Sequence, residues 1–167
     1  AFTRDHPRFR MNDDREVTCY ALLNQHLAGQ DVKAAARAAW YAQRELDDGC
    51  NLLASTLFDA RLLSPADVWR EVRLSVEFNR VRPARAAAGF VDANAATAVH
   101  DLFDNPARYL KRRVDLKAPQ QKELSMLAVV RLAASDPESA AAELEPLQKH
   151  LTGEQLAWAW AVTAKQA

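Results

Sequence analysis

The chain has 167 residues, a length that suits one sizeable domain and is short for two. Its 22 basic and 22 acidic residues cancel to a formal net charge of zero, which removes the global electrostatic argument for binding nucleic acid or an anionic membrane surface. Only four glycines are present, which argues against an all-β fold with its many tight turns, and no apolar run approaches the roughly 18 residues that span a bilayer.

The first 60 or so residues predict three helices with clear starts. Gly29 is expected to end the first helix, because glycine adopts the left-handed conformation at a helix end without steric cost. The expected starts are polar residues that can accept a backbone N–H. These are Asn12 or Asp13 for the first helix, Asp31 for the second, which runs to about Arg44, and Asp47 or Asp48 for the third, from about Cys50 to Ala60.

Seven further helices are expected in the rest of the chain, most of them opened by a polar cap or a proline. Thr152, with Gln155 three residues later, forms a capping box for the last of them. The others begin at Ser64-Pro65, run over about 82–90, 95–104 after Asn94 and 106–113 after Asn105-Pro106, and begin at Pro119 and at Asp136-Pro137.

The sequence therefore predicts an all-α fold of about ten short helices joined by short loops, with no strand. Helices this short cannot each bury an apolar face alone, so neighbours must stack. Several form pairs of roughly 30 to 35 residues, near the size of tetratricopeptide units, although the strict pattern of that repeat is absent. We expect residues 1–167 to form a single segment of an irregular α-solenoid or superhelix; a compact bundle is the alternative.

Cys19 and Cys50 are the two cysteines of the chain. Their spacing fits a disulfide between neighbouring helices as well as it fits two buried thiols that pack as small hydrophobic groups. A metal site is disfavoured, because no CxxC motif or paired histidine accompanies them. The residues alone leave the disulfide and the thiols as equal alternatives.

Three strings in order, RMNDDREVTCYALLNQHLAGQDV, ARAAWYAQRELDDGC and SPADVWREVRLSVEFNRVRPAR, resemble soluble lytic transglycosylases of the Slt type, in the helical superhelix (U-domain) that precedes their catalytic domain. The strings DNPARYL, RLAASDPESAAAELEPL and LTGEQLAWAWAVTAKQA continue in the same style. The likeness covers nearly the whole chain, and its specificity lies in the order of the segments.

The resemblance implies a periplasmic protein that cleaves peptidoglycan glycan strands to 1,6-anhydromuropeptides. It also favours the disulfide between Cys19 and Cys50. The lysozyme-like catalytic domain is expected to be absent from residues 1–167, because the family's Gly-Leu-Met-Gln string is missing. The single Glu-Ser pair, at Glu138, falls in the first turn of an expected helix, where the helix dipole alone favours an acidic residue.

Candidate contacts for an anion or a glycan lie in one basic segment. Tyr109 offers a stacking surface, and the cations could meet a carboxylate or phosphate, although a cationic last turn is also what the helix dipole favours. The segment comprises Arg108, Tyr109, Arg112 and Arg113, with Lys111 and Lys117 beside them.

No catalytic or metal-ligating residue is expected elsewhere. The histidines His6, His26, His100 and His150 lack ligand spacing, and no P-loop, GxGxxG or GxSxG motif indicates a cofactor or nucleophile. Trp40, Trp69, Trp158 and Trp160 fall on apolar faces, but Trp158 and Trp160 cannot face the same way on one helix, so one is expected to pack on a neighbouring repeat or be exposed.

The leading hypothesis is a non-catalytic scaffold region of a lytic transglycosylase, with peptidoglycan and cell-wall proteins as partners of the full-length protein. The alternative is a free-standing helical-repeat adaptor that binds a peptide or protein. A disulfide favours the scaffold, and reduced thiols favour the adaptor. Nucleic-acid binding ranks third because the chain is electrically neutral.

Overall fold

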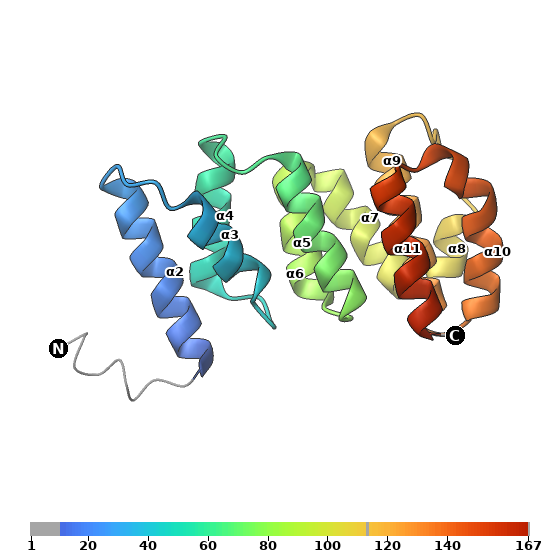
Figure 1. Cartoon of the computed structure of the whole chain (residues 1–167), viewed down its shortest axis with the longest axis horizontal. Helices are drawn as coiled ribbons and strands as arrows, with labels where there is room; N and C mark the ends of the chain where they lie inside the picture. Colours follow the sequence, from blue (N-terminus) through green and yellow to red (C-terminus); the bar gives the residue numbers. More distant parts are fainter. Residues whose placement is uncertain (1–10, 113, 167) are drawn as a thin grey trace. The chain divides into compact units, whose positions relative to one another are not determined.

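The structure, a computed structural model, describes residues 11–112 and 114–166, with no side-chain detail for residues 11–14. All regular structure in this part of the chain is helical, which confirms the all-α fold. Ten α-helices and one 3₁₀ turn follow one another through short loops (Figure 1). They are α2 (Met11–Leu27), α3 (Lys33–Tyr41), α4 (Asp48–Asp59), α5 (Pro65–Glu77), α6 (Val81–Val91), α7 (Ala93–Asp104), α8 (Pro106–Leu110), α9 (Pro119–Ala133), α10 (Pro137–Leu147), the turn η2 (Gln148–His150) and α11 (Gly153–Gln166).

The chain divides into two compact units, Ala1–Glu71 and Val72–Ala167, with the boundary inside α5. In the first unit, α2 packs on both α3 and α4, and α3 packs on α4. Its core is made of large side chains that these three helices and the start of α5 bury completely. They include Trp40, Leu53, Leu57 and Val68.

In the second unit, α9 is the central helix, in contact with α7, α8, α10 and α11. Ten of its fifteen residues are buried, so it has no solvent-facing stripe of the usual kind. Helices α6 and α7 pack closely against each other through small residues, among them Ala84, Ala87 and Ala88 of α6. The helix expected to begin at Pro119 is therefore the core of this unit.

Several predicted helix ends are confirmed. Gly29, two residues after the last residue of α2, has φ of +87°, so it terminates that helix in the left-handed conformation. Asp47 accepts the backbone N–H of Cys50 at 2.9 Å and caps α4. Thr152 and Gln155 form the expected capping box, since each side chain accepts the other residue's backbone N–H, at 3.2 and 3.0 Å.

Four predicted boundaries are wrong. Helix α2 already includes Met11, so it does not begin at Asn12 or Asp13. Helix α3 ends at Tyr41, before Arg44, because the buried Gln43 turns to accept the N–H of Asp47 at 3.2 Å.

The other two lie in the second unit. The cap of α7 is Asp92, not Asn94, since Asp92 has an extended backbone and its carboxylate accepts the N–H of Asn94 at 3.0 Å. Helix α8 ends at Leu110, and residue 113, the predicted end, lies outside the described residues.

Candidate functional site

Cys19 and Cys50 form a disulfide that joins α2 to α4, with Cα atoms 4.9 Å apart. Both residues are completely buried. Gly49 lies beside the bond, and a side chain there would meet the backbone oxygen of Glu16 at 3.0 Å, so glycine allows α4 to approach α2 closely. The disulfide and this close contact fix the pairing of the two helices in the first unit.

Two cations of the basic segment in the second unit pair with neighbouring carboxylates. Arg112 pairs with Asp101 at 3.3 Å, and Arg108 pairs more loosely with Asp104 at 3.6 Å. Arg108 is 71% exposed, which leaves it open to other anions, because exposed pairs of this kind are weak. Arg113 lies outside the described residues.

Tyr109 is buried, with 6% of its surface exposed, and the guanidinium of Arg112 lies over its ring at 5.2 Å. Burial raises the pKa of Tyr109, with nearby Asp101 adding to the rise and Arg112 opposing it. The aromatic face predicted as a stacking surface for sugars is therefore covered by protein.

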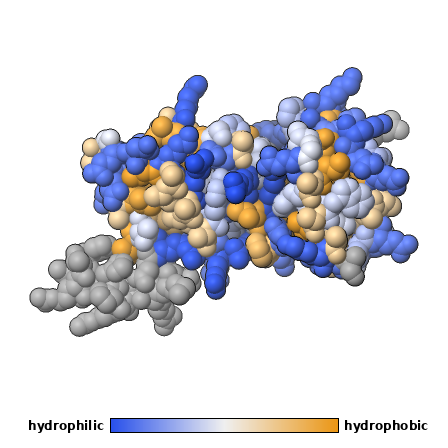
Figure 2. Space-filling model, viewed as in Figure 1, coloured by the Kyte–Doolittle hydropathy of each residue, from blue (hydrophilic) through white to orange (hydrophobic). Residues whose placement is uncertain are grey.

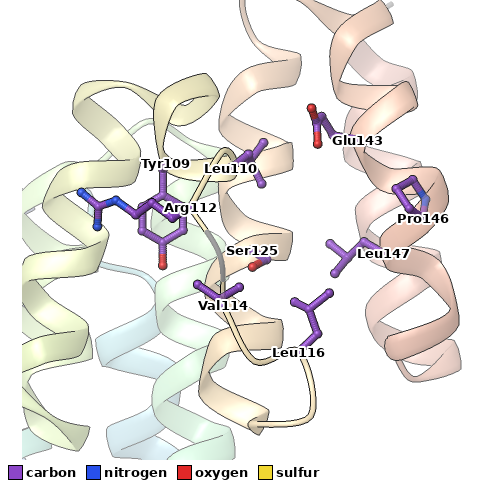
Figure 3. A pocket seen from close by; sticks show the side chains of 9 residues that line it. All are labelled: Tyr109, Leu110, Arg112, Val114, Leu116, Ser125, Glu143, Pro146 and Leu147. Carbon is purple, nitrogen blue, oxygen red and sulfur yellow. The ribbon is translucent and has the colours of Figure 1, made fainter.

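A pocket of about 420 Å³ lies between the end of α8, the loop that follows it, α9 and α10 (Figure 3). Most of its wall is apolar, and its polar groups are two hydroxyls, one carboxylate and one guanidinium. The residues that line it are Tyr109, Leu110, Arg112, Val114, Leu116, Ser125, Glu143, Pro146 and Leu147.

The sequence analysis included Tyr109 and Arg112 but missed Ser125 and Glu143 as pocket residues. Ser125 is one of ten buried positions on α9, and Glu143 is an exposed acidic residue on α10. Neither stands out in its own helix, and only the packing of α10 on α9 brings them to the same pocket. No local sequence signal indicates this pairing.

The sequence analysis also considered Glu138 and the histidines. Glu138 is exposed in the first turn of α10, whose cap is Asp136. In residues 15–112 and 114–166 no three His, Cys, Asp or Glu side chains lie together as a metal site would require, and His6 falls outside these ranges.

The four tryptophans divide as their positions predict. Trp40 is 1% exposed in the core of the first unit, and Trp69 is half-buried. Trp158 is half-buried with Arg73 over its ring at 6.0 Å, whereas Trp160 is 39% exposed. Trp160 is thus the one of the pair on α11 that faces solvent.

No protein-family profile, curated protein or solved structure matches this chain. None of the helices in the described part of the chain is long and apolar enough to cross a membrane.

Proposed function

We propose that this chain is a non-catalytic helical scaffold region of a periplasmic lytic transglycosylase. In this role it holds the catalytic domain of the full-length protein near peptidoglycan and offers a helical surface to glycan strands or to cell-wall proteins. The resemblance in the order of its capped helices is the basis of this assignment.

The disulfide between Cys19 and Cys50 is the observation that carries the proposal furthest. Structural disulfides persist in oxidising compartments such as the bacterial periplasm and are rare in the cytosol. The bond lies within the segment whose sequence carries the resemblance. It favours an exported scaffold over a free-standing adaptor with reduced thiols.

The exposed cations of the second unit support contact with peptidoglycan. Arg108 and Lys111 are exposed, and the carboxylates of peptidoglycan stem peptides are anions that such side chains can meet. Each contact is weak, so binding would rest on many contacts along a long polymer.

Exposed apolar side chains support contacts with other parts of a larger protein. Figure 2 shows hydrophobic residues interspersed among hydrophilic ones on one face of the molecule. The first unit exposes Leu27 and Leu52, and the second exposes Phe78 and Trp160. In the proposed role, neighbouring helices of the scaffold cover such residues.

Sedimentation with purified peptidoglycan sacculi tests the proposal. We expect the chain to pellet with sacculi, and the Arg108→Glu/Lys111→Glu variant to pellet less. Lys149→Glu, a charge reversal at another exposed position of the second unit, is the matched control and should leave the pelleted fraction unchanged. A chain that stays in the supernatant would contradict peptidoglycan contact and favour the adaptor.

A further inference from the structure

The pocket bounded by α8, α9 and α10 has the size and lining of a small-molecule site. Its volume of about 420 Å³ falls within the roughly 300 to 1,000 Å³ that is usual for ligand pockets. Leu110, Leu116 and Leu147 supply apolar wall from the end of α8, the following loop and α10 (Figure 3). An apolar group of a ligand would be desolvated against them.

Two hydroxyls that line the pocket belong to largely buried residues. Ser125 and Tyr109 are each only 6% exposed, and neither hydroxyl makes a hydrogen bond with another residue of the described chain. A serine within a helix often bonds to the carbonyl oxygen four residues earlier, but Ser125 does not. Neither hydroxyl oxygen is fully buried, so solvent or a bound molecule can supply its hydrogen bond.

Among the described residues that line the pocket, the charge without a partner is negative. The guanidinium of Arg112 pairs with Asp101 at 3.3 Å and, in Figure 3, points away from Glu143. Glu143 projects from α10 toward the end of α8 and has no cationic partner within the described residues. A ligand that brings a positive charge to this rim gains an ion pair that no residue described in the structure supplies.

We propose that this pocket binds a small organic amine, with its apolar body against Leu110, Leu116 and Leu147, its ammonium group at Glu143, and a polar group at the Ser125 and Tyr109 hydroxyls. All of these residues belong to the second unit, and none of the observations behind the site uses the cell-wall function proposed above.

Matched probes that differ only in charge test the site. The intact chain is titrated with phenylbutylamine, phenylbutanol and phenylbutyrate, and binding is followed by backbone amide chemical shifts. We expect the amine to shift amides around Ser125, Glu143 and Leu147, and to bind about fivefold more tightly than the alcohol, the gain typical of one partly exposed ion pair. Phenylbutyrate should bind more weakly than either.

Variants distinguish binding of the amine in the pocket from a general attraction of the cation to the protein. Glu143→Gln should remove the preference for the amine over the alcohol, whereas Glu145→Gln, at an exposed position of the same helix, should keep it. Ser125→Ala should weaken all three probes.

Three results would overturn the proposal. They are no amine binding at millimolar concentration, equal binding of amine and carboxylate, and an amine preference that survives in Glu143→Gln. Circular dichroism of each variant establishes that it is folded.

Discussion

Arg73 of α5 and Glu123 of α9, fifty residues apart, form a two-pronged ion pair in the second unit. Both carboxylate oxygens of Glu123 accept a guanidinium N–H of Arg73, and the bond from Nη2 is 2.9 Å long. The side-chain amide of Gln155 on α11 donates a further hydrogen bond to the same carboxylate at 2.8 Å. Glu123 is 3% exposed, so these partners replace the water that its carboxylate loses on folding. Through one carboxylate, three helices of the unit are held in register.

Glu123→Gln should therefore destabilise the chain strongly. It leaves the mostly buried Arg73 without its counter-charge, and removing one member of a buried pair costs about 3 kcal/mol. Lys165→Met is the control, since Lys165 is 69% exposed in its pair with Glu77 and its loss should cost at most about 1 kcal/mol. Urea unfolding measures both, and equal losses would contradict the role given to Glu123.

Reduction of the Cys19–Cys50 bond should lower the free energy of unfolding by about 3.5 kcal/mol, the chain-entropy value for a loop of its length. Urea unfolding with and without a reductant measures the change. The Cys19→Ala/Cys50→Ala variant is the control, because its stability should not respond to reductant. If the oxidised and reduced chains unfold at the same urea concentration, the bond contributes nothing to the native state.

Asp92→Ala should cost about 1 kcal/mol, because it removes the carboxylate that caps α7. Asn94→Ala should be close to neutral, since Asn94 lies within the helix and donates only its backbone N–H to Asp92. Thermal unfolding of the two variants distinguishes them. If Asn94→Ala lost more stability than Asp92→Ala, Asn94 would be the cap, as the sequence pattern indicates.

The phenol of Tyr41 should keep its proton unusually far into the alkaline range. Burial first, and then Asp67 nearby, raise the pKa of Tyr41 to about 12 from the ordinary 10.0, against the opposing effect of Arg70 and Arg37. Its hydroxyl also donates to the backbone oxygen of Asp67 at 2.9 Å. Subtracting the tyrosinate absorbance of Tyr41→Phe from that of the parent chain gives this pKa directly.

The same shift has a consequence for stability. Below pH 10 both the folded and the unfolded chain keep the proton of Tyr41, so its titration changes nothing. Between pH 10 and about 12 the unfolded chain releases this proton first, and stability falls as pH rises. Unfolding free energies of Tyr41→Phe should fall less steeply over that range, and parallel curves would contradict the shift.

Local sequence signals predicted the helices well because caps act through bonds within one turn. The carboxylate of Asp136 accepts the backbone N–H of Ser139 at 3.1 Å. The carboxylate of Asp67 accepts the backbone N–H of Ser64 at 2.9 Å, and the hydroxyl of Ser64 accepts the backbone N–H of Asp67 at 3.2 Å. In each case the two residues are three apart in the sequence. The error at Asn94 has the same local origin. Asp92 and Asn94 are both good caps by residue type, and only the extended backbone at Asp92 separates them.

Local sequence patterns could not predict the contacts that define possible sites, because these contacts join segments that are distant in the sequence. The Arg73–Glu123 pair spans fifty residues, and the pocket combines Ser125 with Glu143 from two different helices. The disulfide could be predicted only in part. The sequence identified Cys19 and Cys50, but a disulfide and two thiols were equal alternatives until the family resemblance was considered. In the structure the bond is present.

The most direct test of the scaffold proposal is mass spectrometry of soluble products after the chain is incubated with purified sacculi, together with a gel of the pellet. The account predicts chain in the pellet and no 1,6-anhydromuropeptides above the level of sacculi alone. Release of anhydromuropeptides, particularly if Glu138→Gln abolished it, would contradict the proposal and identify the chain as an enzyme.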